Sequence, residues 1–365
     1  MMNSIEHTFF ELLKSAIWGT TPKLKHIPTE EEWKDIYRIS NEQTVTGIML
    51  DAISKLPDEQ KPESKLRLQW IVTQKLIERK NGLMNKELVV LSEELKEKGI
   101  ISYLLKGQGV AQSYPIPEHR VSGDIDYYFE ERYFKAASDF FSSKGCIIED
   151  EPDASHAETS YKGTIIEIHR RSATFFTKRL QKRYDEISSE IIKDDKESII
   201  IGGNEIAVLP PMLNALQLLS HMLRHILMSG LGLRQICDWV LFVYNYQRRI
   251  DKELFIAQIK ELQLYNTYKA ITAIATDYLG LPKEYAVCEI SAKDKAIAKK
   301  VMVHIMQYGN FGHYKEHYTT ETKWEYFKAY IRLVKNSIYF TCLSRSEALN
   351  FPIWQMRSIK KVLKH

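Results

Sequence analysis

The chain has 365 residues, of which 44% are hydrophobic and 27% are charged. At roughly 150 residues per domain, this length predicts two or three domains. The composition excludes a mainly disordered chain, a collagen-like chain and a disulfide-stapled miniprotein. Lys and Arg number 51 against 47 Asp and Glu, a formal net charge of +4. This near balance disfavours binding of long nucleic acid, because phosphate-tracking surfaces are strongly basic.

The sequence also predicts where the protein is found. Four cysteines lie far apart and form no C-x-x-C pair, which favours reduced thiols in the cytoplasm: Cys146, Cys237, Cys288 and Cys342. Residues 1–19 lack a basic start followed by an apolar block, so they do not read as a secretory signal. The most apolar region, residues 212–244, is interrupted by charged residues and histidines, whereas a membrane span needs about 20 apolar residues. We therefore expect a cytoplasmic protein that does not enter a membrane.

Residues 1–98 are predicted to be a helical region. Apolar residues recur there at steps of three and four, as in Phe9, Leu12 and Leu13. Thr29 is followed by three glutamates, which is typical of a helix start, because acids favour the positive end of the helix. Residues 80–98 read as a charged amphipathic helix that stops at Gly99, a residue suited to a C-cap.

In residues 99–209 the helical spacing gives way to short apolar runs, which predict a mixed α/β core. Seven short apolar runs are expected to be strands: 100–105, 125–129, 146–149, 157–161, 164–169, 198–201 and 205–208. Lys162-Gly163 and Gly202-Gly203-Asn204 are expected to close two hairpins. A short helix up to Tyr114 and a helix over 133–144 complete this region.

Residues 210–365 are predicted to form a C-terminal helical domain. Helical spacing of apolar residues marks six segments: 212–229, 233–246, 252–262, 267–279, 292–308 and 321–337. The basic stretch 357–364 is interpreted as a solvated helix end. The predicted fold class is therefore α+β, with a mixed sheet flanked by N-terminal and C-terminal helical regions.

Asp124 and Asp126 are the first candidate functional residues. Alternate residues of a strand point to the same side, so both carboxylates would share one face, opposite Ile125 and Tyr127. Two like charges this close repel unless a cation lies between them. Oxygen ligands of this kind suit Mg²⁺ or Mn²⁺. The alternative is a polar strand entry in which Asp124 caps a turn.

Two further segments support a site beside these aspartates. Glu167 lies between Ile166 and Ile168, where a carboxylate is costly to bury without a partner. If its strand neighbours the Asp-x-Asp strand, Glu167 becomes a third carboxylate; the alternative is a solvent-facing edge residue. Upstream, the turn Lys106-Gly107-Gln108-Gly109 lies between a strand and a helix, where backbone N–H groups could receive a phosphate.

The order of these parts resembles the DNA polymerase β-type nucleotidyltransferase superfamily. More narrowly, it resembles an uncharacterised bacterial nucleotidyltransferase family with a Lys-Gly turn, an Arg before Asp-x-Asp, and a Glu-x-His strand. The matching residues are Lys106-Gly107, Arg120, Asp124-Ile125-Asp126 and Glu167-Ile168-His169. The resemblance covers about residues 100–240. One departure is that Gln108 follows Gly107, where the superfamily usually has a serine.

The resemblance implies metal-dependent transfer of a nucleoside monophosphate from an NTP, such as ATP, to an unidentified acceptor hydroxyl or phosphate, with release of pyrophosphate. Asp124, Asp126 and Glu167 would be the catalytic residues and the ligands of Mg²⁺ or Mn²⁺. The implied nucleotide-binding residues are the turn and the preceding arginine: Lys106, Gly107, Gln108 and Arg120. The oligomeric state and the base preference are left open.

A second group of polar residues is a candidate substrate cleft. His221 and His225 share a helix face, as zinc-binding pairs do, but Met222 follows where H-E-x-x-H needs a glutamate. Together with His169, Arg234 and Asp238 they could line a cleft for the acceptor. The bland alternatives are core histidines and a simple intrahelical pair between Arg234 and Asp238.

Two other functions stay open. The first is a nucleotide-binding or regulatory protein on the same fold that has lost catalysis, which the replacement of serine by Gln108 favours. The second is a metal-dependent hydrolase that uses the same three acids.

Overall fold

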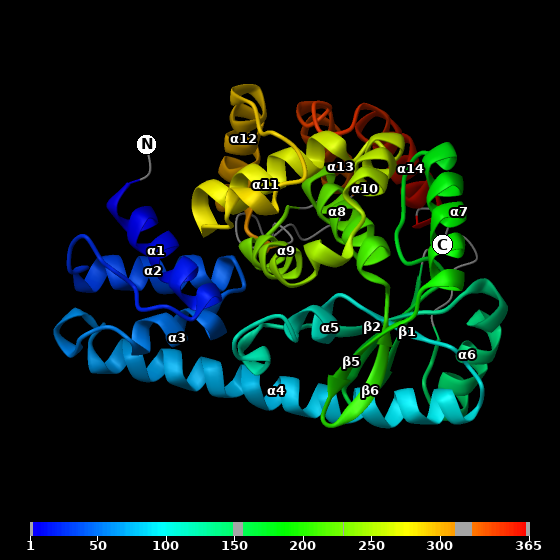
Figure 1. The fold of residues 1–365 in the computed structure, drawn as a ribbon, viewed down its shortest axis with the longest axis horizontal. Helices are drawn as coiled ribbons and strands as arrows, with labels where there is room; N and C mark the ends of the chain where they lie inside the picture. The colour runs from blue at the N-terminus through cyan, green and yellow to red at the C-terminus, as the bar shows by residue number, and fades with distance from the viewer. Residues whose placement is uncertain (1–2, 149–155, 229, 311–322, 363–365) are drawn as a thin grey trace. The chain divides into compact units, whose positions relative to one another are not determined.

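We describe a computed structural model over residues 3–148, 156–228, 230–310 and 323–362 (Figure 1). Its contacts divide the chain into two compact units. The first unit comprises Met1–Asn41, Val45–Ser172 and Ser188–Asn214; the second comprises Glu42–Thr44, Ala173–Ile187 and Ala215–His365. The sequence predicted three regions, 1–98, 99–209 and 210–365. That division stays a prediction.

Four helices open the first unit, and they confirm the predicted helical texture of residues 1–98. They are α1 (Ser4–Trp18), α2 (Glu30–Glu42), α3 (Thr46–Ser54) and α4 (Ser64–Glu97). The predicted start at Thr29 is confirmed: Glu32 N–H donates to Thr29 Oγ1, and Thr29 N–H donates to the Glu32 carboxylate. α4 is one uninterrupted helix of 34 residues. The sequence showed helical spacing in its first half, at Leu66, Leu68 and Trp70, but bounded a helix only over 80–98.

A six-stranded mixed sheet forms the centre of the first unit, in the order β3-β4-β2-β1-β6-β5. The strands are β1 (Tyr103–Leu105), β2 (Asp124–Tyr128), β3 (His156–Tyr161), β4 (Thr164–His169), β5 (Glu197–Ile201) and β6 (Asn204–Val208). β2 runs parallel to β4, and β1 parallel to β6, while the other pairs are antiparallel. The predicted α+β class is confirmed.

Both predicted hairpins are present, and their turn residues explain why. Lys162 and Gly163 have positive φ angles of 50° and 87°, and Gly202 and Gly203 have 58° and 83°. Two consecutive positive φ values match the twist of antiparallel strands in a two-residue loop. The turns therefore set the register of β3 against β4 and of β5 against β6.

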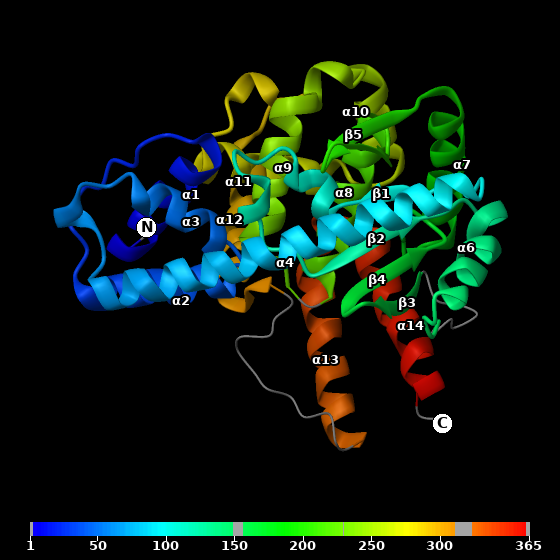
Figure 2. The same cartoon turned by 90° about the horizontal axis from the view of Figure 1, so that it is seen from below.

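One face of the sheet packs against helices. The C-terminal half of α4 and α6 (Glu131–Ser143) bury side chains such as Leu88, Leu91 and Phe141 against Ile125, Ile166 and their neighbours. Figure 2 shows α4 running along the sheet. Tyr127 is fully buried on this face, and its hydroxyl bonds to Ser92 and to the carbonyl of Leu88. The alternate residues of β2 are therefore left on the opposite face.

Two sequence predictions are wrong in detail, and one helix was missed. Residues 146–148 form no strand, since Cys146 packs into the core and Ile147 is 81% exposed; residue 149 lies outside the described residues. The strand predicted over 100–105 begins only at Tyr103. Helix α7 (Lys178–Asp194) was missed, although its buried Leu180, Tyr184 and Ile187 recur at steps of four and three.

The second unit is built of helices. They are α8 (Pro211–Leu227), α9 (Leu233–Tyr246), α10 (Lys252–Glu261), α11 (Tyr265–Leu279), α12 (Ala292–Tyr308), α13 (Lys323–Tyr339) and α14 (Arg345–Val362). The predictions for α8 to α13 agree to within a few residues; the predicted ends at 229 and 321–322 lie outside the described residues. α14 was expected only as a basic helix end. The predicted tail residues 363–364 also lie outside the described residues.

Candidate functional site

Three carboxylates meet on the face of the sheet opposite the helices. In the parallel pair of β2 and β4, Asp126 lies directly across from Glu167. Asp124 is two residues before Asp126, so it points to the same side. One oxygen from each of the three carboxylates lies within 4.8 Å of the others. We call Asp124, Asp126 and Glu167 the oxygen site.

Lys106 supplies a positive charge to this site from the turn after β1. Its backbone adopts φ 40° and ψ −137°, a region that residues other than glycine rarely occupy. Its ammonium lies 2.9 Å from the Asp126 carboxylate, which is 2% exposed. Burial alone would lower the pKa of Lys106, but the carboxylates of the oxygen site, Asp126 first, outweigh burial and raise it. The strained turn thus holds a buried cation against the carboxylates.

His169 joins two of the three carboxylates. Its Nε2 lies 2.8 Å from Asp126 Oδ1 and 3.0 Å from Glu167 Oε2. Burial would lower the pKa of His169, yet the hydrogen bonds to both acids raise it. Burial would likewise raise the pKa of Asp126, but the charge of Lys106 and the hydrogen bond from His169 hold it below its usual range.

Burial and the neighbouring charge of Asp126 would raise the pKa of Glu167, but the hydrogen bond from His169 and the positive charges of His169 and Lys106 together lower it. The three carboxylates and Lys106 together carry two net negative charges when His169 is neutral, and one when it is protonated. Carboxylate oxygens are the ligands that Mg²⁺ and Mn²⁺ prefer. The donor set therefore fits a divalent cation at the oxygen site.

The sequence analysis missed His156, which starts β3 and lies opposite His169 in the antiparallel register. The two ring centroids are 5.2 Å apart. The signal was available, because counting back from the two-residue turn at Lys162-Gly163 pairs position 156 with position 169.

The other predicted nucleotide-binding residues lie in a network behind the turn. Gln108 is buried; its amide donates to Asn85 Oδ1, and its carbonyl oxygen accepts from Ser122. Arg120 is also buried and donates to the Ser122 hydroxyl. Gly107, with φ 36°, begins the five-residue helix α5 (Gly107–Ala111). Ser122 thus connects Gln108 to Arg120, and contact of these residues with nucleotide stays a prediction.

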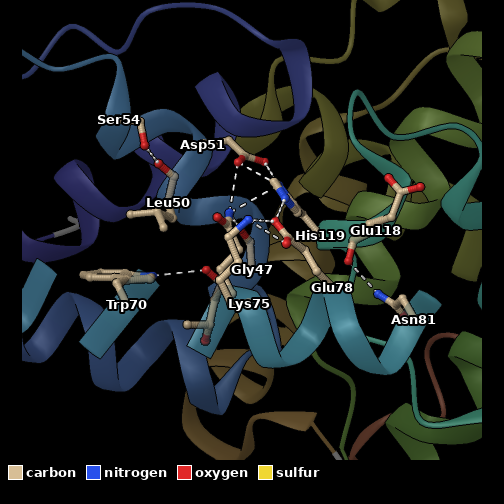
Figure 3. Close-up of polar contacts among 12 residues, drawn as sticks. Gly47, Leu50, Asp51, Ser54, Trp70, Lys75, Glu78, Asn81, Glu118 and His119 are labelled. Atoms are coloured by element: carbon tan, nitrogen blue, oxygen red, sulfur yellow. Dashed lines mark hydrogen bonds and ion pairs between the residues drawn. The ribbon is translucent and has the colours of Figure 1, made fainter. Parts of the chain in front are cut away.

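A second histidine between carboxylates positions the segment that leads into β2 (Figure 3). The segment includes the short 3-10 helix η2 (Pro117–His119). His119 Nδ1 lies 2.8 Å from Asp51 of α3, and its Nε2 lies 2.8 Å from Glu78 of α4. Asn81 of α4 donates to the carbonyls of Glu118 and Arg120. We call Asp51, Glu78 and His119 the His119 bridge.

Close packing also fixes this segment. A Cβ added to Gly47 of α3 would lie 2.1 Å from the carbonyl oxygen of His119, a distance at which real atoms overlap. Gly47 therefore allows α3 to approach η2 closely enough for the His119 bridge to form.

The candidate cleft residues of the C-terminal helices belong to the second unit. His221 and His225 lie on α8 with their Nε2 atoms 3.1 Å apart. Arg234 and Asp238 lie on α9, where Asp238 is buried. Their assignment to the acceptor cleft stays a prediction, as does that of His169, which the structure places among the carboxylates of the first unit.

Comparison with known proteins assigns the chain to a family. A family model described as "Uncharacterised nucleotidyltransferase" matches residues 29–280, which is more than half of the chain. The chain therefore belongs to this family of nucleotidyltransferases, and the resemblance drawn from its motifs is confirmed at that level.

Two other comparisons add little. No curated protein matches the chain. Among solved structures, the chain is similar to an antigenic nucleotidyltransferase-like protein from Paracoccidioides brasiliensis, with 13% identity and a TM-score of 0.31 over 44% of this chain and 75% of that one. Within the described residues, no helix is both long enough and apolar enough to cross a membrane.

Proposed function

We propose that the protein transfers a nucleoside monophosphate from an NTP to an acceptor hydroxyl or phosphate. The observation that carries the proposal is the meeting of Asp124, Asp126 and Glu167 on one face of the sheet, within 4.8 Å of one another. Membership of the nucleotidyltransferase family supports it. In the reaction, the acceptor oxygen forms a bond to the α-phosphorus, the bond from that phosphorus to pyrophosphate breaks, and an acceptor hydroxyl gives its proton to solvent water.

The residues of the site would divide this work. Asp124 and Asp126 would hold Mg²⁺ or Mn²⁺, and Glu167 would complete the ligand set on the acceptor side. When bound there, such ions neutralise charge on the transferring phosphoryl oxygens. Lys106 would neutralise negative charge on the triphosphate. Its ion pair with Asp126 holds the ammonium at the site.

His169 would orient the carboxylates in this scheme. Its Nε2 faces both Asp126 and Glu167, so one imidazole fixes the spacing of two acids on different strands. A fixed ligand spacing lowers the reorganisation that binding and transfer require.

The experiment is incubation of the protein with each NTP labelled at the α-phosphate, with Mg²⁺ and with cell extract. We expect label on one acceptor species and release of pyrophosphate. Free phosphate without a labelled acceptor would instead identify a hydrolase. Nucleotide binding without pyrophosphate release would identify a regulatory protein. The turn favours this alternative, because Gln108 replaces the usual serine and its side chain is bonded to Asn85 and Ser122.

Asp124→Asn tests the oxygen site directly. We expect transfer to fall roughly 1,000-fold, because loss of a metal ligand removes several kcal/mol of charge stabilisation and each 1.36 kcal/mol is about tenfold. Asp124 is partly exposed, so the melting temperature should change little. Glu158→Gln is the matched control, since Glu158 faces Glu167 across the hairpin but lies outside the oxygen site. Equal activity of the two variants would contradict the proposal.

A further inference from the structure

The β3–β4 hairpin brings two histidines and a glutamate together beside the oxygen site. His156 and His169 lie directly across from each other in the register. Glu167 precedes His169 by two residues, so the two side chains share a face of β4. The geometry of a tight two-residue turn thus places two imidazoles and one carboxylate on the same side of the sheet.

Each oxygen of the Glu167 carboxylate lies near one imidazole. Oε2 is 3.0 Å from His169 Nε2, and Oε1 is 4.0 Å from His156 Nε2. One ligand atom from each of the three residues lies within 4.8 Å of the others. At this spacing the three ligand atoms could bind a single ion.

The three side chains are also reachable from solvent in a graded way. The exposed fractions are 35% for His156, 20% for Glu167 and 12% for His169. An ion could therefore arrive at the exposed imidazole first and contact the two more buried ligands next. We call His156, Glu167 and His169 the nitrogen site.

We propose that the nitrogen site binds a first-row transition-metal ion of the Zn²⁺ and Co²⁺ type. Imidazole nitrogen together with one carboxylate suits such ions, whereas Mg²⁺ prefers oxygen ligands alone. This proposal rests on the proposed function, because Glu167 belongs to both the oxygen site and the nitrogen site. It names the kind of metal that the acceptor side of the site would take.

The geometry of the two histidines separates this cluster from an ordinary buried ion pair. Lys106 pairs with Asp126, and His169 contacts both Asp126 and Glu167. His156 adds a second imidazole that faces the other oxygen of Glu167. Two imidazoles around one carboxylate form a ligand set with positions open to solvent or acceptor, as catalytic transition-metal sites have.

The test uses the metal alone, without nucleotide. Co²⁺ is titrated into the full-length protein, and binding is followed by the visible absorption of the ion and by calorimetry. We expect one Co²⁺ per chain at this site, which Zn²⁺ displaces and Mg²⁺ does not. His156→Gln and His169→Gln should each weaken binding by at least the roughly 10- to 100-fold that loss of a mere outer-shell partner costs.

Three variants serve as controls. Glu158→Gln, on the same face of β3, should bind Co²⁺ as the wild type does. Asp124→Asn should keep the Co²⁺ absorption and lose Mg²⁺ binding, because Asp124 lies outside the nitrogen site. His225→Gln removes the other close histidine pair, that of α8, and should leave the absorption unchanged.

Several outcomes would overturn the inference. They are wild-type Co²⁺ affinity in His156→Gln, loss of the absorption in His225→Gln, or displacement by Mg²⁺ alone. If the buried His169→Gln unfolds, His156→Gln decides, since His156 is partly exposed on an edge strand. Failure of the proposed function is read separately: Co²⁺ bound through the histidines with no nucleotide transfer refutes only the transferase, and transfer without histidine-dependent Co²⁺ binding refutes only the nitrogen site.

Discussion

Two places in the first unit hold a histidine between two carboxylates, and they use its ring in different ways. At the His119 bridge, Nδ1 faces Asp51 and Nε2 faces Glu78, so the two acids lie on opposite sides of the ring. At the oxygen site, Nε2 of His169 alone faces both Asp126 and Glu167. The two acids there lie side by side.

The difference separates a structural joint from a candidate site. Carboxylates on opposite sides of an imidazole are kept apart by the ring, so no single ion can contact both. The His119 bridge instead ties α3, α4 and the segment before β2 together. Carboxylates that share one nitrogen converge, and convergent oxygens are what a divalent cation needs. The same three residue types thus form a structural joint in one place and a candidate metal site in the other.

The largest expected effect is that of Asp126→Asn, which should lower both activity and stability. The variant should lose nucleotide transfer and also lose about 3–5 kcal/mol of unfolding free energy, because Lys106 and His169 keep buried charge without their shared partner. Urea unfolding and the labelled-NTP assay measure the two losses. Adding Lys106→Met to Asp126→Asn should restore part of the stability and none of the activity. A fully stable single variant would show that the buried ion pair contributes little.

A smaller effect is expected from Glu78→Gln, at the other histidine. Loss of the charged partner of His119 should cost about 1–3 kcal/mol of unfolding free energy, with transfer unchanged, because Glu78 belongs to the joint alone. Lys75→Ala is the matched control: Lys75 also pairs with Glu78 but is 67% exposed, so its loss should cost less than about 1 kcal/mol. If Glu78→Gln and Lys75→Ala lowered the free energy of unfolding equally, the contact between His119 and Glu78 would add no stability beyond the exposed ion pair.

The smallest effect is a pH dependence of stability at the His119 bridge. Burial would lower the pKa of His119, but its hydrogen bonds to Asp51 and Glu78 raise it above the ordinary 6.5. A raised pKa means that the folded state favours the protonated form. Its stabilisation is fully present below the ordinary pKa and is lost as pH rises through the folded pKa.

Melting temperatures of the wild type and His119→Asn at about pH 5.5 and about pH 9 measure this dependence. We expect the wild type to exceed the variant by a larger margin at the lower pH. The comparison between the two proteins removes the parallel contribution of His169, whose pKa is also raised. An equal margin at both pH values would contradict a charged His119.

Much of the local structure could be predicted from sequence, because local sterics set it. The period of two along β2 places Asp124 and Asp126 on one face and Tyr127 on the other, as the structure has them. The Lys162-Gly163 turn fixed the hairpin of β3 and β4. The wrong strand over 146–149 shows the limit: a short apolar run becomes a strand only where another strand accepts its hydrogen bonds.

The candidate site was predicted in part for the same reason. Asp124, Asp126 and Glu167 were found from residue type and strand alternation, whereas their meeting depended on a guess that β2 and β4 are neighbours. The side chain of Gln108 bonds to Asn85 and Ser122, which the sequence did not predict, and its contact with nucleotide stays a prediction. A polar residue in a turn has several partners in reach, and only the folded chain selects among them.

By itself, then, the sequence determined most of the helices, the hairpins, the shared face of the two aspartates and the family. The tertiary structure decided which distant groups meet: Asp126 with Lys106 and His169, and His119 with Asp51, 68 residues away. The physical reason is range. Backbone sterics and turn chemistry act over a few residues, whereas the order of strands and the pairing of buried charges follow from burying the apolar surface of the whole sheet at once.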